Sequence, residues 1–148
     1  MHRKVAAALV AALALVAAGC GSSESLTRAQ LVNRVEVACR QAQAQMDAST
    51  RARGGSQNDQ QLRFVTALRD AQRTVLDKID GLEPPDAAES DFDVFKQSVE
   101  DRLELIDRVA SDGADDVASA IRSIQREAEG VGERAQQSAR ALGIDGCI

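Results

Sequence analysis

Residues 91–110 read DFDVFKQSVEDRLELIDRVA, and this stretch decides the fold class of the chain. Its apolar side chains recur at intervals of three or four residues, at Phe92, Phe95, Val99, Leu103, Ile106 and Ala110. This spacing places them along one face of an α-helix, whereas a half-buried β-strand would alternate apolar and polar residues. The stretch therefore predicts an amphipathic helix that packs one face against other elements.

Three more stretches of the same kind surround it, separated by glycine and proline. The four predicted helices cover residues 27–49, 58–80, 86–110 and 114–142, with Pro84 and Pro85 preventing the second from running into the third. No part of the chain alternates with period two. Amphipathic helices with short connections predict an all-α protein with an up-down four-helix bundle. A three-helix bundle with a loose first helix is the alternative.

The predicted helix ends carry side chains that can satisfy free backbone groups. Thr27 with Gln30, and Asn58 with Gln61, have the spacing of a capping box. Gly143 follows the last apolar residue of the fourth helix, where a left-handed cap is expected. We therefore expect one helical domain over residues 27–148.

The beginning of the chain has a different character. Arg3 and Lys4 precede residues 5–18, which contain only Ala, Leu and Val. That apolar run is shorter than the roughly 20 residues a membrane-spanning helix needs. A cationic start, a short apolar core and small residues at its end are typical of a signal peptide, predicted here over residues 1–19. The alternative is an ordinary secreted protein in which Cys20, the residue after this segment, is present by chance.

Residues 15–20, Leu-Val-Ala-Ala-Gly-Cys, resemble the lipobox of bacterial lipoproteins. The resemblance implies that Cys20 is lipidated and that the chain is cleaved after Gly19, although Ala17 stands where that family more often has Leu or Val. Residues 20–26 are then a small, polar tether reaching about 20 Å when extended. The resemblance implies a cell-membrane location on the extracytoplasmic face, with the membrane as partner through the lipid.

Two cysteines remain once Cys20 is assigned to lipid. Cys39 lies in the first predicted helix, and Cys147 lies in the tail beyond Gly143 and Gly146. In an oxidising compartment an even pair is usually a disulfide, so we predict a bond between Cys39 and Cys147. Two free thiols are the alternative.

The pattern also resembles small, largely uncharacterised actinobacterial lipoproteins. The resemblance rests on Cys39, on the Leu-Glu-Pro-Pro joint at residues 82–85, and on the tail at residues 139–147, which contains Leu-Gly-x-x-x-Cys. It implies a fold and a location and assigns no activity.

Composition excludes several kinds of partner. The 148 residues include 18 Lys and Arg against 23 Asp and Glu, a net charge of −5, whereas nucleic-acid binding needs a basic patch. Three Phe are the only aromatics, which leaves no Trp or Tyr for stacking bases or sugars. The single histidine, His2, lies in the predicted signal peptide. Histidine is the commonest general base and metal ligand, so we expect no nucleic acid, no metal and no cofactor.

Few residues remain as candidates for chemistry. The acidic side chains of residues 91–104 are best explained as a solvated helix face, and the loop at residues 112–116, Asp-Gly-Ala-Asp-Asp, by helix capping rather than Ca²⁺ binding. Gly130 and Gly132 interrupt the fourth helix at about 1 kcal/mol each. A close neighbouring helix, a kink or a functional hinge could account for them.

No nucleophile with a neighbouring base is recognisable in this sequence. We therefore expect a non-enzymatic binding or interaction module that takes a protein partner or a hydrophobic ligand between its helices. The alternatives are an enzyme using carboxylates only and a structural component of the cell envelope.

Overall fold

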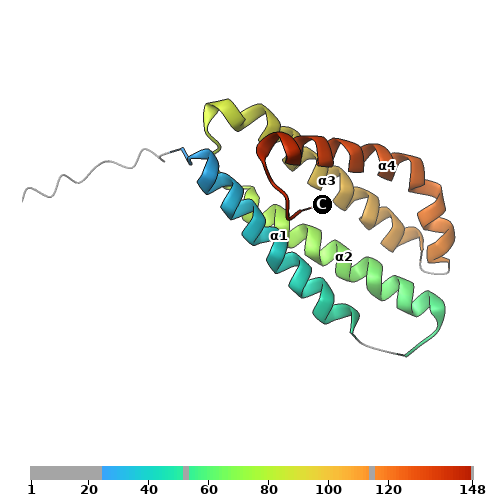
Figure 1. The fold of residues 1–148 in the computed structure, drawn as a ribbon. Helices are drawn as coiled ribbons and strands as arrows, with labels where there is room; N and C mark the ends of the chain where they lie inside the picture. Colours follow the sequence, from blue (N-terminus) through green and yellow to red (C-terminus); the bar gives the residue numbers. More distant parts are fainter. Residues whose placement is uncertain (1–24, 52–53, 114–115, 148) are drawn as a thin grey trace, which may run out of the picture.

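A computed structural model of the chain describes residues 25–51, 54–113 and 116–147 (Figure 1). Its elements are α1 (Arg28–Thr50), α2 (Gln57–Ile79), the short 3₁₀ turn η1 (Asp86–Ala88), α3 (Glu89–Asp112) and α4 (Val117–Leu142). The described residues contain no strand, and the predicted all-α bundle of four helices is confirmed. The predicted signal peptide, Cys20 and the tether up to residue 24 lie outside the described residues.

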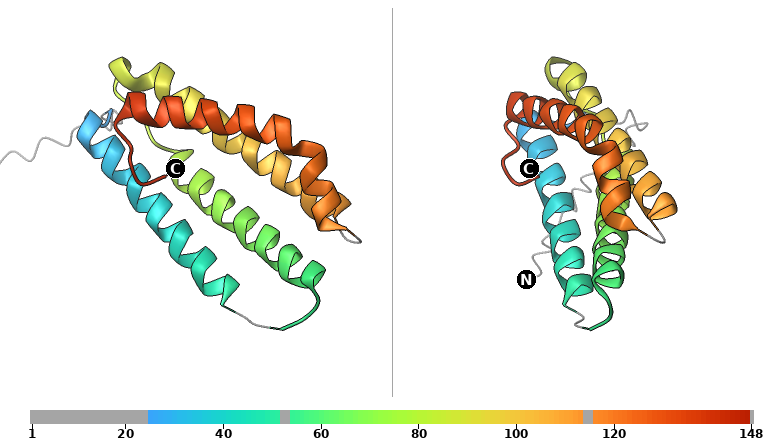
Figure 2. Two further views of the ribbon diagram at one scale, coloured as in Figure 1. Left: turned by 45° about the vertical axis from the view of Figure 1, so that its right-hand side comes forward. Right: turned by 90° about the vertical axis from the view of Figure 1, so that its right-hand side faces the viewer.

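The four helices form two antiparallel hairpins. α1 packs on α2, α3 packs on α4, and contact between α2 and α3 joins the hairpins. α1 and α4 have little direct contact, and the C-terminal tail crosses from the end of α4 to α1 (Figure 2). The alternative of a loose first helix is wrong, because α1 is continuous and buries Leu31, Val35, Ala38, Cys39 and Ala42.

Capping chemistry sets the starts of the first two helices. Thr27 and Gln30 form the predicted capping box at α1. At α2 the prediction was two residues late, because Ser56 and Asp59 form the box there. The side chain of Asn58 instead accepts a hydrogen bond of 3.1 Å from the backbone N–H of Val117, which ties the start of α2 to the start of α4.

The boundaries of the second hairpin also differ from expectation. A 3₁₀ turn occupies residues 86–88, so α3 begins at Glu89 and continues to Asp112, two residues beyond the predicted end. α4 begins at Val117, where the Asp116 carboxylate accepts the N–H of Ser119 at 2.9 Å. Ala114 and Asp115 lie outside the described residues.

The end of α4 is closed by a Schellman motif. Gly143 has φ of 82°, and its N–H donates to the carbonyl of Arg140, while the N–H of Ile144 donates to that of Ala139. The reversal buries Ile144 completely. Arg28 of α1 donates to the carbonyls of Leu142 and Ala141, so a cation from the other hairpin compensates the negative end of α4.

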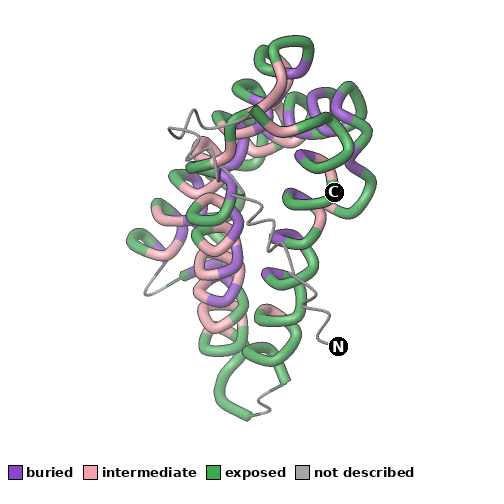
Figure 3. Tube along the Cα trace, turned by 90° about the vertical axis from the view of Figure 1, so that its left-hand side faces the viewer, coloured by how far each residue is buried: buried purple, intermediate pink, exposed green. Residues whose placement is uncertain are grey.

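Buried residues line the inner faces of the helices, in two separate clusters (Figure 3). The first joins α1, α2, the first half of α3, the end of α4 and the tail, and its aromatics are Phe92 and Phe95. The second joins the other ends of α2, α3 and α4, with Val65, Ile106 and Val117 among its members. The core is therefore interrupted part of the way along the bundle.

The interruption coincides with an error in the predicted face of α3. Leu103 and Ala110 are only partly buried, whereas Leu105 and Val109 are buried. α3 contacts α2 on one side and α4 on another, so its buried face is wider than the single stripe the spacing suggested. Among the described residues, no helix is long and apolar enough to cross a membrane.

Candidate functional site

The disulfide between Cys39 and Cys147 fixes the C-terminal tail to α1. The two Cα atoms are 5.3 Å apart, within the usual range for a disulfide, and the cysteines are 108 residues apart in the chain. The turn at Gly143 makes this bond geometrically accessible, because it sends the tail from the end of α4 toward α1 (Figure 1). The bond therefore bridges the two hairpins at the side where α1 and α4 separate.

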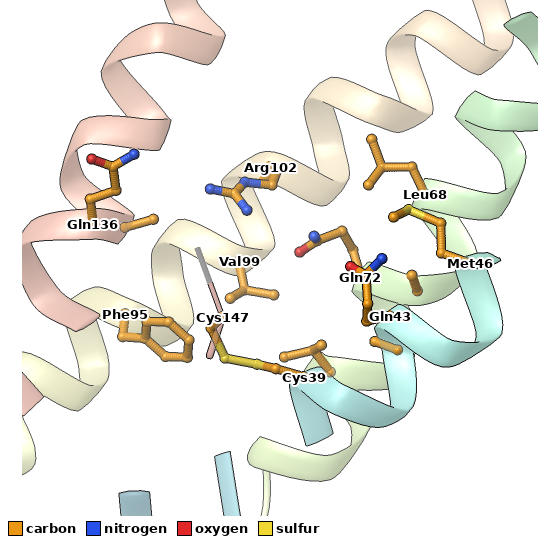
Figure 4. Close-up of a pocket in the computed structure, with 14 residues that line it drawn as sticks. Cys39, Gln43, Met46, Leu68, Gln72, Phe95, Val99, Arg102, Gln136 and Cys147 are labelled. Carbon is orange, nitrogen blue, oxygen red and sulfur yellow. A yellow bond between two sulfur atoms is a disulfide. The ribbon is translucent and has the colours of Figure 1, made fainter. Parts of the chain in front are cut away.

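A cavity of about 210 Å³ lies beside this disulfide, between all four helices (Figure 4). Three of the helices contribute an alanine to its wall, namely Ala42 from α1, Ala71 from α2 and Ala135 from α4. Each of these is at most 8% exposed, so each occupies an inward position with a small side chain. Well-packed interiors leave little empty space, so the short side chains at this level explain why the core is open here.

Arg102 is the distinctive residue of the cavity. It lies on α3 between Val99 and Ile106, at the spacing of three and four that marks an inward position. Its guanidinium group points into the space between the helices (Figure 4). Burial lowers the pKa of Arg102 from its usual value, yet an arginine remains a cation at neutral pH.

Two other charged residues of α3 form ion pairs with α4. Asp101 accepts from Arg134 of α4 at 2.9 Å, and Arg108 lies 2.7 Å from Glu127. The pKa of Asp101 is held below its ordinary value, first by a hydrogen bond from Gln97 and then by Arg134. The acidic face of α3 was predicted to be solvated. Part of it instead forms an ion pair with α4. Arg102 has no such partner among the described residues.

An apolar groove of about 320 Å³ adjoins the cavity, between α2, α3 and α4. Leu68 and Arg102 line both spaces, so the groove begins where the cavity ends. Phe64 and Ile121 line the groove and are 49% and 43% exposed, although both are large apolar side chains. Exposed apolar residues gathered at one groove are typical of binding sites.

The lining of this site offers groups suited to noncovalent contacts. It offers apolar walls, one cationic group and the side-chain amides of Gln43, Gln72 and Gln136. Within the part of the chain that the structure describes, no three His, Cys, Asp or Glu residues converge as a metal site would require. The arrangement can hold a molecule that has an apolar body and a polar end.

The glycine pair of α4 takes no part in this site. Both glycines lie within a continuous helix, and a Cβ added at Gly132 would meet nothing within 4 Å. One added at Gly130 would come no closer than 3.8 Å to Arg134. Close approach of another helix therefore does not require glycine at either position.

Sequence reasoning found the disulfide pair and missed Arg102. The signal for Arg102 is its place at helical spacing among the apolar positions 95, 99, 106 and 109, whereas the predicted apolar series contains Leu103. Comparison of the chain with protein-family models, curated proteins and solved structures found no match.

Proposed function

We propose that this protein is a lipid-anchored, extracytoplasmic lipoprotein whose helical domain is a non-enzymatic binding module. The observation that carries the binding role is the cavity beside the Cys39–Cys147 disulfide, together with the apolar groove that adjoins it. The lipid anchor is supported by the lipobox resemblance at residues 15–20. A short tether at residues 20–26 would hold the domain close to the membrane.

The anchor is tested by Cys20→Ser. Two acyl chains hold a protein on a membrane far more firmly than one, so losing the lipidated cysteine should move the protein out of the membrane fraction or leave the precursor uncut. Mass spectrometry of the wild-type protein should find the lipid on Cys20. A mature N-terminus without lipid would contradict the anchor.

The binding role is tested with a neutral fluorescent probe, N-phenyl-1-naphthylamine. The full chain carrying Cys20→Ser keeps every residue of the helices and avoids detergent. We expect saturable binding at one site, and Ala42→Leu should abolish it because the larger side chain occupies the cavity. Ala44→Leu is the matched control, since Ala44 is exposed two residues further along α1. Equal probe binding in both variants, or no saturable binding in the parent chain, would refute this role.

A further inference from the structure

Arg102 lies on the face of α3 whose other residues are apolar. Four buried apolar residues surround it at helical spacing along α3, two before it and two after it: Phe95, Val99, Ile106 and Val109. Removing a cation from water is costly unless an opposite charge or hydrogen bonds compensate it. Arg102 has neither an ion pair nor a hydrogen bond among the described residues. The fold therefore leaves a partly buried cation uncompensated.

The neighbouring groups do not supply the missing charge. The carboxylate next to it in sequence, Asp101, is already bound by Gln97 and Arg134, each at 2.9 Å. Gln72 and Gln136, which line the same cavity, are neutral amides (Figure 4). Because no described carboxylate compensates Arg102, an anionic ligand group would complete the site.

The groove defines the other end of such a ligand. Arg102 lines it together with Leu68, Ile106, Ile124 and other apolar residues, so its lining is almost entirely apolar. Ligand sites commonly enclose about 300–1,000 Å³, and the groove alone, at about 320 Å³, lies at the lower end of that range. An apolar space with one cation in its wall matches a molecule that has an apolar body and one charged end.

We propose that the cavity and the groove together bind a single-chain amphiphile with an anionic head, the head held by Arg102 and the hydrocarbon chain lying in the groove. This inference rests on the proposed binding function and names the ligand class of the same site. Carboxylate and phosphate heads share the required chemistry, because the guanidinium group donates two parallel hydrogen bonds to either. A source in the membrane fits a domain held on a short tether.

The test is isothermal titration calorimetry with decanoate and decyl phosphate below their micelle concentrations and with decanol below its solubility limit. The protein is again the full chain carrying Cys20→Ser. Hydrogen bonds to charged groups are worth more than neutral ones, so at least one anion should bind about tenfold or more tightly than decanol. The tighter of the two anions identifies the head group. Equal affinities for all three would overturn the proposal.

Variants of Arg102 locate the effect. Arg102→Gln should bring the affinity for the anions down to that for decanol and leave decanol binding unchanged. Arg102→Lys should keep part of the preference for anions. Arg34→Gln is the control, because Arg34 is exposed on α1 and lies outside both spaces, and it should change nothing. A preference for anions that survives in Arg102→Gln would show the assignment to be wrong.

A stability measurement separates a binding role from a structural one. Since Arg102 has no partner to lose, Arg102→Gln should unfold at the same or a higher denaturant concentration than its parent. Clear destabilisation would mean that Arg102 holds the helices together, and would overturn the proposal. If the neutral probe binds but the anions bind no better than decanol, the binding function stands and the ligand class fails; if the probe does not bind, both fail.

Discussion

Replacing Cys147 by alanine opens a loop whose ends are 108 residues apart, nearly the whole helical domain. In the chain-entropy model a cross-link over about 100 residues stabilises the folded state by about 4.7 kcal/mol, chiefly by restricting the unfolded chain. This is a large share of the roughly 5–15 kcal/mol by which small domains are stable. We expect Cys147→Ala to lower the free energy of unfolding by about 3–5 kcal/mol and the melting temperature by about 10–20 °C.

The assay is urea unfolding of the oxidised protein, followed by circular dichroism at the helical signal. Cys39→Ala should have the same effect as Cys147→Ala, and the double variant should be no less stable than either, because one bond is lost in every case. The dependence of the free energy on urea should become steeper in each variant, since the unfolded chain without the cross-link exposes more surface.

Reduction provides the control for the cysteine substitutions. Wild-type protein treated with dithiothreitol should unfold like the double variant, which itself should not respond to the reductant. Equal unfolding midpoints for oxidised and reduced wild-type protein would refute the reasoning. So would a double variant markedly less stable than both single variants, because the side chains would then act separately.

Two other features of the fold give further predictions. Gly132→Ala should stabilise the protein by about 1 kcal/mol, because the added Cβ meets nothing within 4 Å. Gly113→Ala should destabilise it, because its Cβ would lie 2.5 Å from the carbonyl oxygen of Val109. Urea unfolding measures the stability of both variants. A destabilising Gly132→Ala would indicate that α4 needs flexibility there. Stability should also fall on acidification, because Gln97 and Arg134 lower the pKa of Asp101 in the folded state. The contribution of Asp101 to stability is present above its unfolded pKa of about 3.9 and is lost as the pH falls through its folded pKa. Asp101→Asn should weaken that dependence in unfolding measured between pH 7 and pH 2, and an unchanged acid profile would contradict it.

The ends of the helices show how far local chemistry predicts structure. The predicted capping box at Thr27 and Gln30 and the predicted left-handed cap at Gly143 are confirmed, because each depends on residues three or four positions apart. At α2 the predicted cap at Asn58 is wrong, because Ser56 and Asp59 form the capping box there. Asn58 contacts α4, which the sequence around it could not reveal.

The candidate site was less predictable than the helices. The pairing of Cys39 with Cys147 followed from cysteine count and compartment, since few partners were available. The cavity depends on Ala42, Ala71 and Ala135 meeting at one level of the bundle. Those alanines are far apart in the chain, and alanine is common on any helix face. Nothing local distinguishes them.

The sequence by itself determined the helical class, the number of helices and most of their ends, because helical periodicity and capping act over a few residues. Only the tertiary structure decided that α1 and α4 separate, that the tail bridges them and that Arg102 faces the space between the hairpins. The physical reason is that the rotation of each helix about its axis is set by the packing of all its neighbours at once. Adjacent residues lie about 100° apart around a helix axis, so a rotation of about that size replaces Leu103 by Arg102 at the inward position of α3.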